Sequence, residues 1–355
     1  MVIVHRHRIR VWRPAERRLF EVSPWGGIVR LFHRFTVVLA GCVAGIGVMA
    51  GPAVAQPGGQ SVDAAGLTAG NTGSAVTSAK GLSAEEYWTP ARMAEAIVAG
   101  PPRVTAGSTV EQRAPRPGPR GKVEGALPTV VSPKADIHTM SGRVFFVDDH
   151  GGDHSCSGST VNSGGKRLVF TAGHCVHGGG SGRGWFDVNR WVFVPEYHGG
   201  SPFGTWNAYQ LWTKTAWIDN ANRAFDVAAV VMQPKDGVRI VDAVGGQGIR
   251  WGYGYGHGVH MFGYPADPPF DGSGLYYCSG TTWNEGGFPT LGCTMTGGAS
   301  GGPWLAEYGV TFWAYLDGVN SWMFWDPDPT HVYKWQSPYF SYDTAGSLFD
   351  AVKDM

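Results

Sequence analysis

Ser300 stands in a stretch whose composition suits a nucleophile. Four glycines surround it in Thr294-Met295-Thr296-Gly297-Gly298-Ala299-Ser300-Gly301-Gly302-Pro303. Glycines allow positive φ and tight turns, so consecutive backbone N–H groups can converge on one point and hold an oxyanion. A simple Gly/Ser loop is the alternative, because the chain contains 54 glycines. The chemistry at Ser300 therefore depends on a base and an orienting acid elsewhere.

His174 is the candidate base. It follows an apolar run and precedes a cysteine in Phe170-Thr171-Ala172-Gly173-His174-Cys175. A disulfide at Cys175 would fix the backbone beside the imidazole, which suits a ring that must keep one orientation. The alternative is a structural histidine at the end of a strand.

Asp226 is the candidate acid, because it leads directly into the apolar run Val227-Ala228-Ala229-Val230-Val231. A carboxylate in such a setting is costly to bury unless it is hydrogen-bonded, so we expect it to have a partner. An acid against the far nitrogen of an imidazole orients the ring and stabilises the imidazolium. Together His174 and Asp226 could activate Ser300 for attack on a carbonyl group.

Short strands are the elements expected to position these residues. From Ile137 onward, short apolar runs alternate with Gly, Asp, Asn and Pro, which favours strands of a sandwich or barrel. The runs are Val144–Val147, Arg167–Phe170, Trp191–Val194 and Val227–Val231. The one convincing helix of this part is Ala345–Val352, with Asp343 and Thr344 as its cap.

Composition divides the chain into three parts. Residues 1–55 are Arg-rich, then apolar, and end in Pro52-Ala53-Val54-Ala55, which predicts a signal peptide cleaved before Gln56. A membrane anchor is the alternative, but the apolar run is short for one. Residues 56–135 read as a prosegment and linker, largely disordered. Within them, Ser83 and Glu86 form a capping box that predicts a short helix from Tyr87 to Val98. Residues 136–355 form the folded domain.

Charge and cysteine content exclude some classes of function. Residues 136–355 hold 12 basic and 20 acidic side chains, a net charge of −8 (12 minus 20), which argues against a nucleic-acid partner. Four cysteines follow the leader with no C-x-x-C spacing, so a zinc site is not expected. In an exported chain these cysteines indicate two disulfides, with three possible pairings.

Three motifs in the order His, Asp, Ser resemble the trypsin-like (chymotrypsin-fold) serine peptidases: Thr171–Cys175, Asp226–Ala228 and Gly298–Pro303. Met261–Pro265, Thr296–Trp304 and Tyr87-Trp88-Thr89-Pro90 are similar to secreted bacterial members related to glutamyl endopeptidases. The resemblance covers roughly residues 137–355. It implies an all-β fold of two six-stranded antiparallel β-barrels, with the active site between them and a C-terminal helix.

The resemblance also implies roles for individual residues. Ser300 would be the nucleophile, His174 the general base and Asp226 the orienting acid, with the amides of Gly298 and Ser300 as oxyanion hole. The disulfides would join Cys156 to Cys175 and Cys278 to Cys293. The substrate-binding residues would be Thr294, Asn320, Ser321 and Trp322. The implied protein is a secreted, extracellular, monomeric endopeptidase made as a zymogen. It acts on protein or peptide substrates, without cofactor, metal, nucleic-acid partner or stable membrane anchor.

The sequence departs from the family at positions that concern activation and specificity. Ala299 stands where many animal members carry the aspartate that pairs with a new N-terminal amine, so that activation switch is not expected. Thr294 carries no charge near the place of a pocket-floor acid, and Asn320 stands where acid-specific enzymes tend to have histidine. Primary specificity therefore stays open.

Two other functions remain to be weighed. A protease-fold binding protein without activity usually lacks a member of the His–Asp–Ser set, and none is missing here. An esterase commonly places its acid and histidine after a G-x-S-x-G serine, whereas here both precede Ser300.

Overall fold

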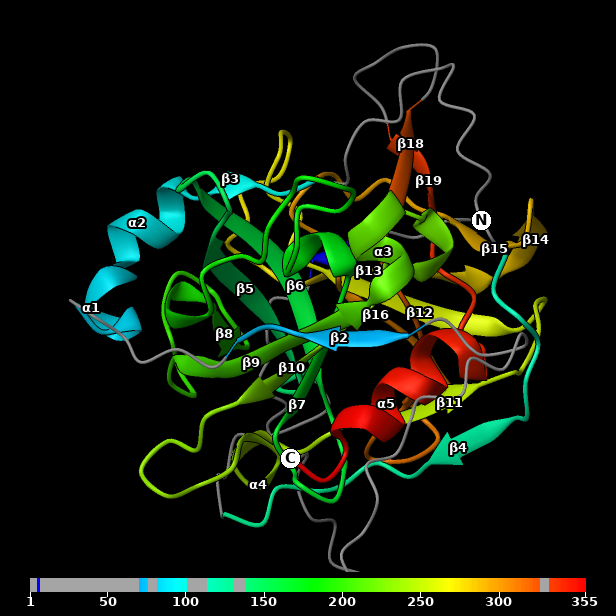
Figure 1. Ribbon diagram of the computed structural model, residues 1–355, viewed down its shortest axis with the longest axis horizontal. Helices are drawn as coiled ribbons and strands as arrows, with labels where there is room; N and C mark the ends of the chain where they lie inside the picture. Colours follow the sequence, from blue (N-terminus) through cyan, green and yellow to red (C-terminus); the bar gives the residue numbers. More distant parts are fainter. Residues whose placement is uncertain (1–4, 7–69, 76–81, 101–113, 131–137, 326–331) are drawn as a thin grey trace, which may run out of the picture. The chain divides into compact units, whose positions relative to one another are not determined.

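The computed structural model describes residues 5–6, 70–75, 82–100, 114–130, 138–325 and 332–355 (Figure 1). All of them belong to one compact unit made of Met1–Arg8 and Leu67–Met355. The expected signal-peptide cleavage site lies outside the described residues. Among the described helices, none is long and apolar enough to cross a membrane.

A closed barrel of six antiparallel strands carries the first half of the domain. Its strands are β5 (Ser141–Val147), β6 (Asp153–Val161), β7 (Leu168–Thr171), β8 (Val192–Pro195), β9 (Trp206–Lys214) and β10 (Ala228–Met232). They follow the order β10-β7-β6-β5-β8-β9, and β10 also pairs with β9, which closes the ring. Two strands from the expected prosegment extend this sheet: β2 (Asn71–Gly73) beside β9, and β3 (Ile97–Val98) parallel to β6.

The second half consists of two further sheets. One has the order β1-β13-β12-β16-β17-β11-β4, and the other β14-β15-β19-β18. The bounds are β1 (His5–Arg6), β4 (Gly121–Val123), β11 (Gly248–Trp251), β12 (Gly258–Gly263), β13 (Tyr276–Thr281), β14 (Trp283–Glu285), β15 (Phe288–Gly292), β16 (Pro303–Ala306), β17 (Tyr315–Val319), β18 (Trp322–Trp325) and β19 (Val332–Gln336). The all-β prediction is confirmed.

The described helices are short and lie around the sheets. They are α1 (Ala84–Tyr87), α2 (Pro90–Glu95), α3 (Thr215–Asn220), α4 (Ile240–Val244) and α5 (Ser347–Val352). The remaining helical turns are η1 (Gly173–Cys175), η2 (Val188–Arg190), η3 (Arg223–Phe225) and the π-helical η4 (Tyr342–Gly346). The predicted C-terminal helix is confirmed from Ser347 to Val352. Its start differs, because the capping box of Ser341 and Thr344 begins the preceding turn η4, and α5 follows from Gly346 without a side-chain cap. The Asp343 carboxylate instead accepts from the Arg116 N–H at 3.0 Å.

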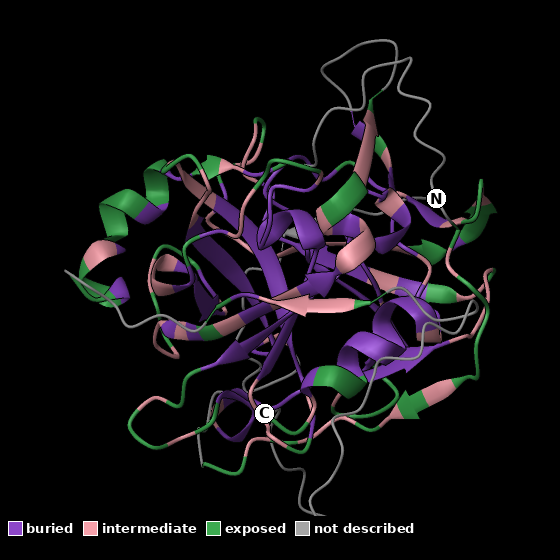
Figure 2. Cartoon of the chain, viewed as in Figure 1, coloured by how far each residue is buried: buried purple, intermediate pink, exposed green. Residues whose placement is uncertain are grey.

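The core fills the barrel, whose strands are mostly buried (Figure 2). β10 is buried along its whole length, which explains why its sequence is a continuous apolar run rather than an alternating one. A second cluster lies between the other sheets and includes Met295, Trp304 and Trp335. The site residues thus stand on strand ends and loops that are anchored in a rigid core.

The helix predicted at Ser83 exists but is divided in two. The Ser83–Glu86 capping box is formed as expected and starts α1. Thr89 then caps a second helix with Pro90 at its first position, because proline there loses no hydrogen bond. α2 ends at Glu95, and the chain continues as β3. The last residues of the predicted helix are therefore a strand. It pairs with β6, which is distant in the sequence, so neighbouring residues could not predict it.

Candidate active site

His174 and Asp226 are held together by two hydrogen bonds. The turn η1 after β7 carries His174, and Asp226 follows η3 two residues before β10 begins. The His174 backbone N–H donates to Asp226 Oδ1 at 2.8 Å, and His174 Nδ1 lies 2.8 Å from Asp226 Oδ2. The two side chains are 2% and 0% exposed. This arrangement fixes the imidazole and leaves its Nε2 buried, with no hydrogen-bond partner among the described residues.

A third hydrogen bond completes the surroundings of the carboxylate. Ser321 Oγ donates to Asp226 Oδ2 at 2.6 Å. Three donors explain how a fully buried carboxylate is tolerated at this place. Gly173 is also required, since a Cβ added there would lie 2.9 Å from Asp226 Oδ1. The expected partner of Asp226 is therefore present, and Ser321 is an additional one.

The disulfide Cys156–Cys175 braces the histidine turn from β6. Trp191 Nε1 also donates to the Cys175 carbonyl oxygen at 2.9 Å, so the backbone next to His174 is held from two sides. Cys156, His174 and Cys175 are the group of possible metal ligands found among the described residues. Both sulfurs are joined to each other, so neither is a thiolate that could bind a metal ion.

The loop around Ser300 owes its shape to glycines. Gly298 and Gly301 have φ of +91° and +77°, which disfavours any larger residue. A Cβ on Gly301 would lie 2.0 Å from Thr171 Oγ1, so the loop packs against the strand end that leads to His174. Among the described residues, the N–H groups of Gly298 and Ser300 donate to no backbone carbonyl. Both remain available for an oxyanion.

Ser157 holds this loop from β6 and was missed by the sequence reasoning. Its N–H donates to the Ser300 carbonyl at 2.7 Å, and its Oγ donates to the Gly298 carbonyl at 2.9 Å. The same Oγ accepts from the Tyr264 N–H at 2.9 Å. The one available signal was its place beside Cys156 in a buried strand, and that does not distinguish it from other strand serines.

The four expected substrate-binding residues fall into two pairs. Asn320 is fully buried, and its Nδ2 donates to the carbonyls of Phe262 at 2.8 Å and Ala299 at 2.6 Å. The buried Ser321 is bonded to Asp226 as described. These two side chains therefore support the loop and the acid. Thr294 is exposed and Trp322 partly exposed, with the Arg223 guanidinium 4.4 Å from the Trp322 ring centroid.

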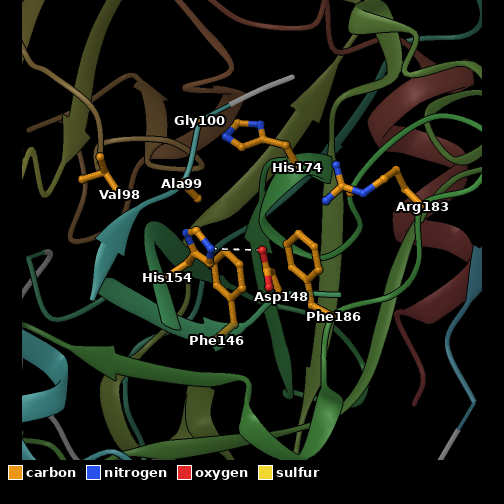
Figure 3. Close-up of a pocket in the computed structure, with 10 residues that line it drawn as sticks. Val98, Ala99, Gly100, Phe146, Asp148, His154, His174, Arg183 and Phe186 are labelled. Atoms are coloured by element: carbon orange, nitrogen blue, oxygen red, sulfur yellow. Dashed lines mark ion pairs between the residues drawn. The ribbon is translucent and has the colours of Figure 1, made fainter. Parts of the chain in front are cut away.

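A cavity of about 200 Å³ lies beside His174. Figure 3 shows it between Phe146, His154, Arg183 and Phe186, with Val98, Ala99 and Gly100 along one wall. Arg183 forms a double hydrogen bond to Asp149 at 2.6 and 2.8 Å, which holds the pKa of that carboxyl well below its usual range. Ser300 Oγ donates to the Ala99 carbonyl at 3.4 Å. Ala99 thus lies next to both the serine and the histidine.

Comparison with known proteins identifies the family. No family model matches the sequence, and no curated protein matches it. The solved structure of the protease Anisep from Arthrobacter nicotinovorans matches with 30% identity and a TM-score of 0.56, covering 65% of this chain and 100% of that one. AL20, a thermostable serine protease from an extremophilic microorganism, matches with 31% identity and a TM-score of 0.55, covering 61% and 97%. This chain belongs to the chymotrypsin-fold serine peptidases.

A Glu endopeptidase structure also matches this serine peptidase, with 16% identity and a TM-score of 0.48 over 65% of this chain and 98% of that one. The expectation of a hydrolase that acts on peptide bonds is confirmed by Anisep and AL20. Both disulfides of the peptidase have the expected pairing, Cys156–Cys175 and Cys278–Cys293.

Proposed function

We propose that this serine peptidase is a secreted endopeptidase in which Ser300 is the nucleophile, His174 the general base and Asp226 the orienting acid. The observation that carries the proposal is the buried His174–Asp226 pair, joined at 2.8 Å through Nδ1 with Nε2 left unpaired. A base oriented in this way and a serine in a glycine-built loop, both next to Ala99, suit acyl transfer.

The reaction would proceed through an acyl-enzyme. His174 Nε2 accepts the Ser300 hydroxyl proton while Oγ bonds to the substrate carbonyl carbon. The carbonyl oxygen becomes an oxyanion and accepts hydrogen bonds from the N–H groups of Gly298 and Ser300, each worth about 3–4 kcal/mol in related chemistry. The imidazolium then gives its proton to the leaving amine as the C–N bond breaks. Water repeats the sequence on the acyl-enzyme, releasing the acid and restoring Ser300.

Secretion is supported by the cysteines and by the leader. Both disulfides favour an oxidising compartment. The Arg-rich and apolar leader ending at Ala55 is typical of an export signal.

The test uses what we call the processed form. The full chain is folded first, then cut at a recognition sequence for an unrelated protease inserted within residues 101–113, and the upstream fragment is removed. The processed form should cleave a denatured protein, and Ser300→Ala should lower the rate by at least about 10³-fold. Ser181→Ala, at an exposed serine, is the matched control and should keep the rate. A folded processed form that cleaves nothing would favour the binding-protein alternative.

A further inference from the structure

Residues 82–100 lie on the peptidase and lead to its candidate active site. Figure 1 shows α1, α2 and β3 in cyan beside β5, β6 and β8. The segment contains the motif Tyr87-Trp88-Thr89-Pro90, for which the proposed reaction has no use. Each residue of this motif has a defined place in the structure, and together they show how the segment is held.

Trp88 anchors the segment in the domain. It is 3% exposed and packs against the fully buried Phe145 of β5, with ring centroids 5.5 Å apart. Its Nε1 donates to the Arg190 carbonyl at 2.7 Å. Met93 of α2 joins the same hydrophobic cluster, which also includes Val192 of β8. An aromatic side chain that buries its ring and satisfies its N–H in this way is typical of the dominant residue of an interface.

Polar contacts fix the orientation of the two helices. Tyr87 Oη donates to Asp153 Oδ1 at 2.6 Å, and Arg92 Nε donates to Asp153 Oδ2 at 2.9 Å. Asp153 is the first residue of β6, and Glu85 pairs with Lys235. Thr89 and Pro90 turn the chain between the helices, as described above. The segment is thus held by an apolar anchor and by charges on both sides of it.

Backbone pairing then carries the chain to Ser300. Ile97 and Val98 of β3 lie opposite His154 and Ser155 of β6 in parallel register. The Ala99 N–H donates to the Ser155 carbonyl at 3.0 Å. This places a strand of the segment along the β6 edge, only a few residues from Ser157, which holds the nucleophile loop.

The end of the strand occupies the space that a substrate needs. Ser300 Oγ donates to the Ala99 carbonyl oxygen at 3.4 Å, and Val98 Cγ2 lies 3.2 Å from the position of a Cβ built on Gly297. Ala99 and Gly100 line the cavity that His174 also lines, as Figure 3 shows. A peptide carbonyl cannot reach Ser300 while Ala99 stays there.

The contact between Ser300 and Ala99 does not have the geometry of a reacting substrate. Attack requires Ser300 Oγ to approach the carbonyl carbon while the carbonyl oxygen accepts from the oxyanion amides. Here the hydroxyl donates to the oxygen itself. Within the described residues, the N–H groups of Gly298 and Ser300 make no hydrogen bond to Ala99. His174 Nε2 is also unpaired, so the Ser300 hydroxyl is hydrogen-bonded to Ala99 and not to the base.

We propose that residues 82–100 are a tethered inhibitor: Trp88 docks the segment, and Ala99, directly after β3, blocks Ser300 until the segment is released. This inference rests on the proposed function, because it needs Ser300 as the nucleophile. Release would follow a cut between Gly100 and the domain, after which the freed segment can dissociate.

The rate of fluorophosphonate labelling at Ser300 tests the proposal. The uncut full chain should label at least about tenfold more slowly than the processed form, which corresponds to about 1.4 kcal/mol. Uncut Trp88→Ala should label at nearly the processed rate. Glu95→Ala changes an exposed residue of α2, in the same segment as Trp88, and should leave the uncut chain slow to label. Equal labelling of uncut and processed wild type would contradict the proposed inhibitor role and leave the proposed function intact.

Failure of the proposed function would look different, because no form of the protein would label. A binding measurement keeps the two outcomes apart. A synthetic peptide of residues 82–100 with a fluorophore should bind processed Ser300→Ala protein, and the peptide with Trp88→Ala should bind at least about tenfold more weakly. Absence of binding by the wild-type peptide would contradict the claim that residues 82–100 dock on the domain.

Intact mass after long incubation distinguishes inhibitor from substrate. The uncut chain should show no Ser300-dependent cut between Ala99 and Gly100. A cut there that disappears in Ser300→Ala would overturn the inhibitor and make the segment a substrate of its own site.

Discussion

Asp226 accepts hydrogen bonds from the His174 backbone N–H and from Ser321 Oγ, and its Oδ2 faces His174 Nδ1. A neutral isostere cannot accept all of these, because one of its two side-chain atoms is a donor. The identity of the residue therefore controls the tautomer of His174, not only its position.

Asp226→Asn should lower kcat of the processed form by about 10³–10⁴-fold, because the imidazole is then held in the wrong tautomer. Steady-state kinetics on a peptide substrate measure this. Asp219→Asn, at an exposed aspartate, is the matched control and should change kcat little. A kcat for Asp226→Asn close to that of the control would remove Asp226 from the mechanism.

Ser157 supports the nucleophile loop without occupying the cavity. Ser157→Ala leaves the Gly298 carbonyl and the Tyr264 N–H without their partner, so the free energy of unfolding should fall by about 1–3 kcal/mol. The kcat of the processed form should fall while KM changes little, because the loop is displaced and the binding surface is not. Urea unfolding and kinetics measure the two effects. An unchanged kcat in a destabilised protein would make Ser157 merely structural.

The Asp242 carboxylate holds the short helix α4 to neighbouring segments of the chain. Burial opposes ionisation of Asp242, but hydrogen bonds from Lys166, Arg239 and Thr129 outweigh it and hold the pKa below its ordinary value. A lowered pKa in the folded state means that the contribution to stability is present above the ordinary value and is lost as the pH falls through the folded value.

Asp242→Asn should therefore lower the free energy of unfolding by about 1 kcal/mol at pH 7. The difference from wild type should shrink below about pH 4, where the unfolded chain begins to bind the proton. Denaturant unfolding at several pH values measures it. Asp236→Asn, at an exposed aspartate, should show no such trend. A difference that stays constant with pH would contradict the ionic origin of the effect.

Local patterns predicted the elements that depend on local chemistry. The Ser83–Glu86 capping box and the apolar run of β10 each needed only neighbouring residues, and both are confirmed. The strand at Ile97 was predicted as helix, because its pairing partner on β6 is far away in the sequence. Asn320 was expected to face the substrate, although its side chain is bonded to the carbonyls of Phe262 in β12 and Ala299 in the serine loop. Spacing alone cannot reveal such partners.

The Cys278–Cys293 disulfide joins the two sheets of the second half. Cys278 lies in β13 of one sheet, and Cys293 directly follows β15 of the other. Both cysteines are fully buried in the cluster that contains Met295 and Trp335. The order of the His, Asp and Ser motifs could be recognised from the sequence, whereas the packing of these sheets behind the nucleophile loop could not.

The double variant Cys278→Ala/Cys293→Ala should lower the free energy of unfolding by about 3 kcal/mol, as expected for closing a loop of this length. Thermal or urea unfolding of the processed form measures the change. The variant should still label at Ser300, because the turn that carries His174 is braced by the other disulfide, Cys156–Cys175. A variant as stable as wild type would show that packing alone joins the sheets.

Ser300 is the proposed nucleophile of this serine peptidase. Fluorophosphonate labelling of the processed form, followed by peptide mapping by mass spectrometry, tests this assignment. We expect one adduct, on Ser300, that is absent from Ser300→Ala and greatly reduced in Asp226→Asn. An adduct on another residue, or none on a folded processed form, would contradict the claim.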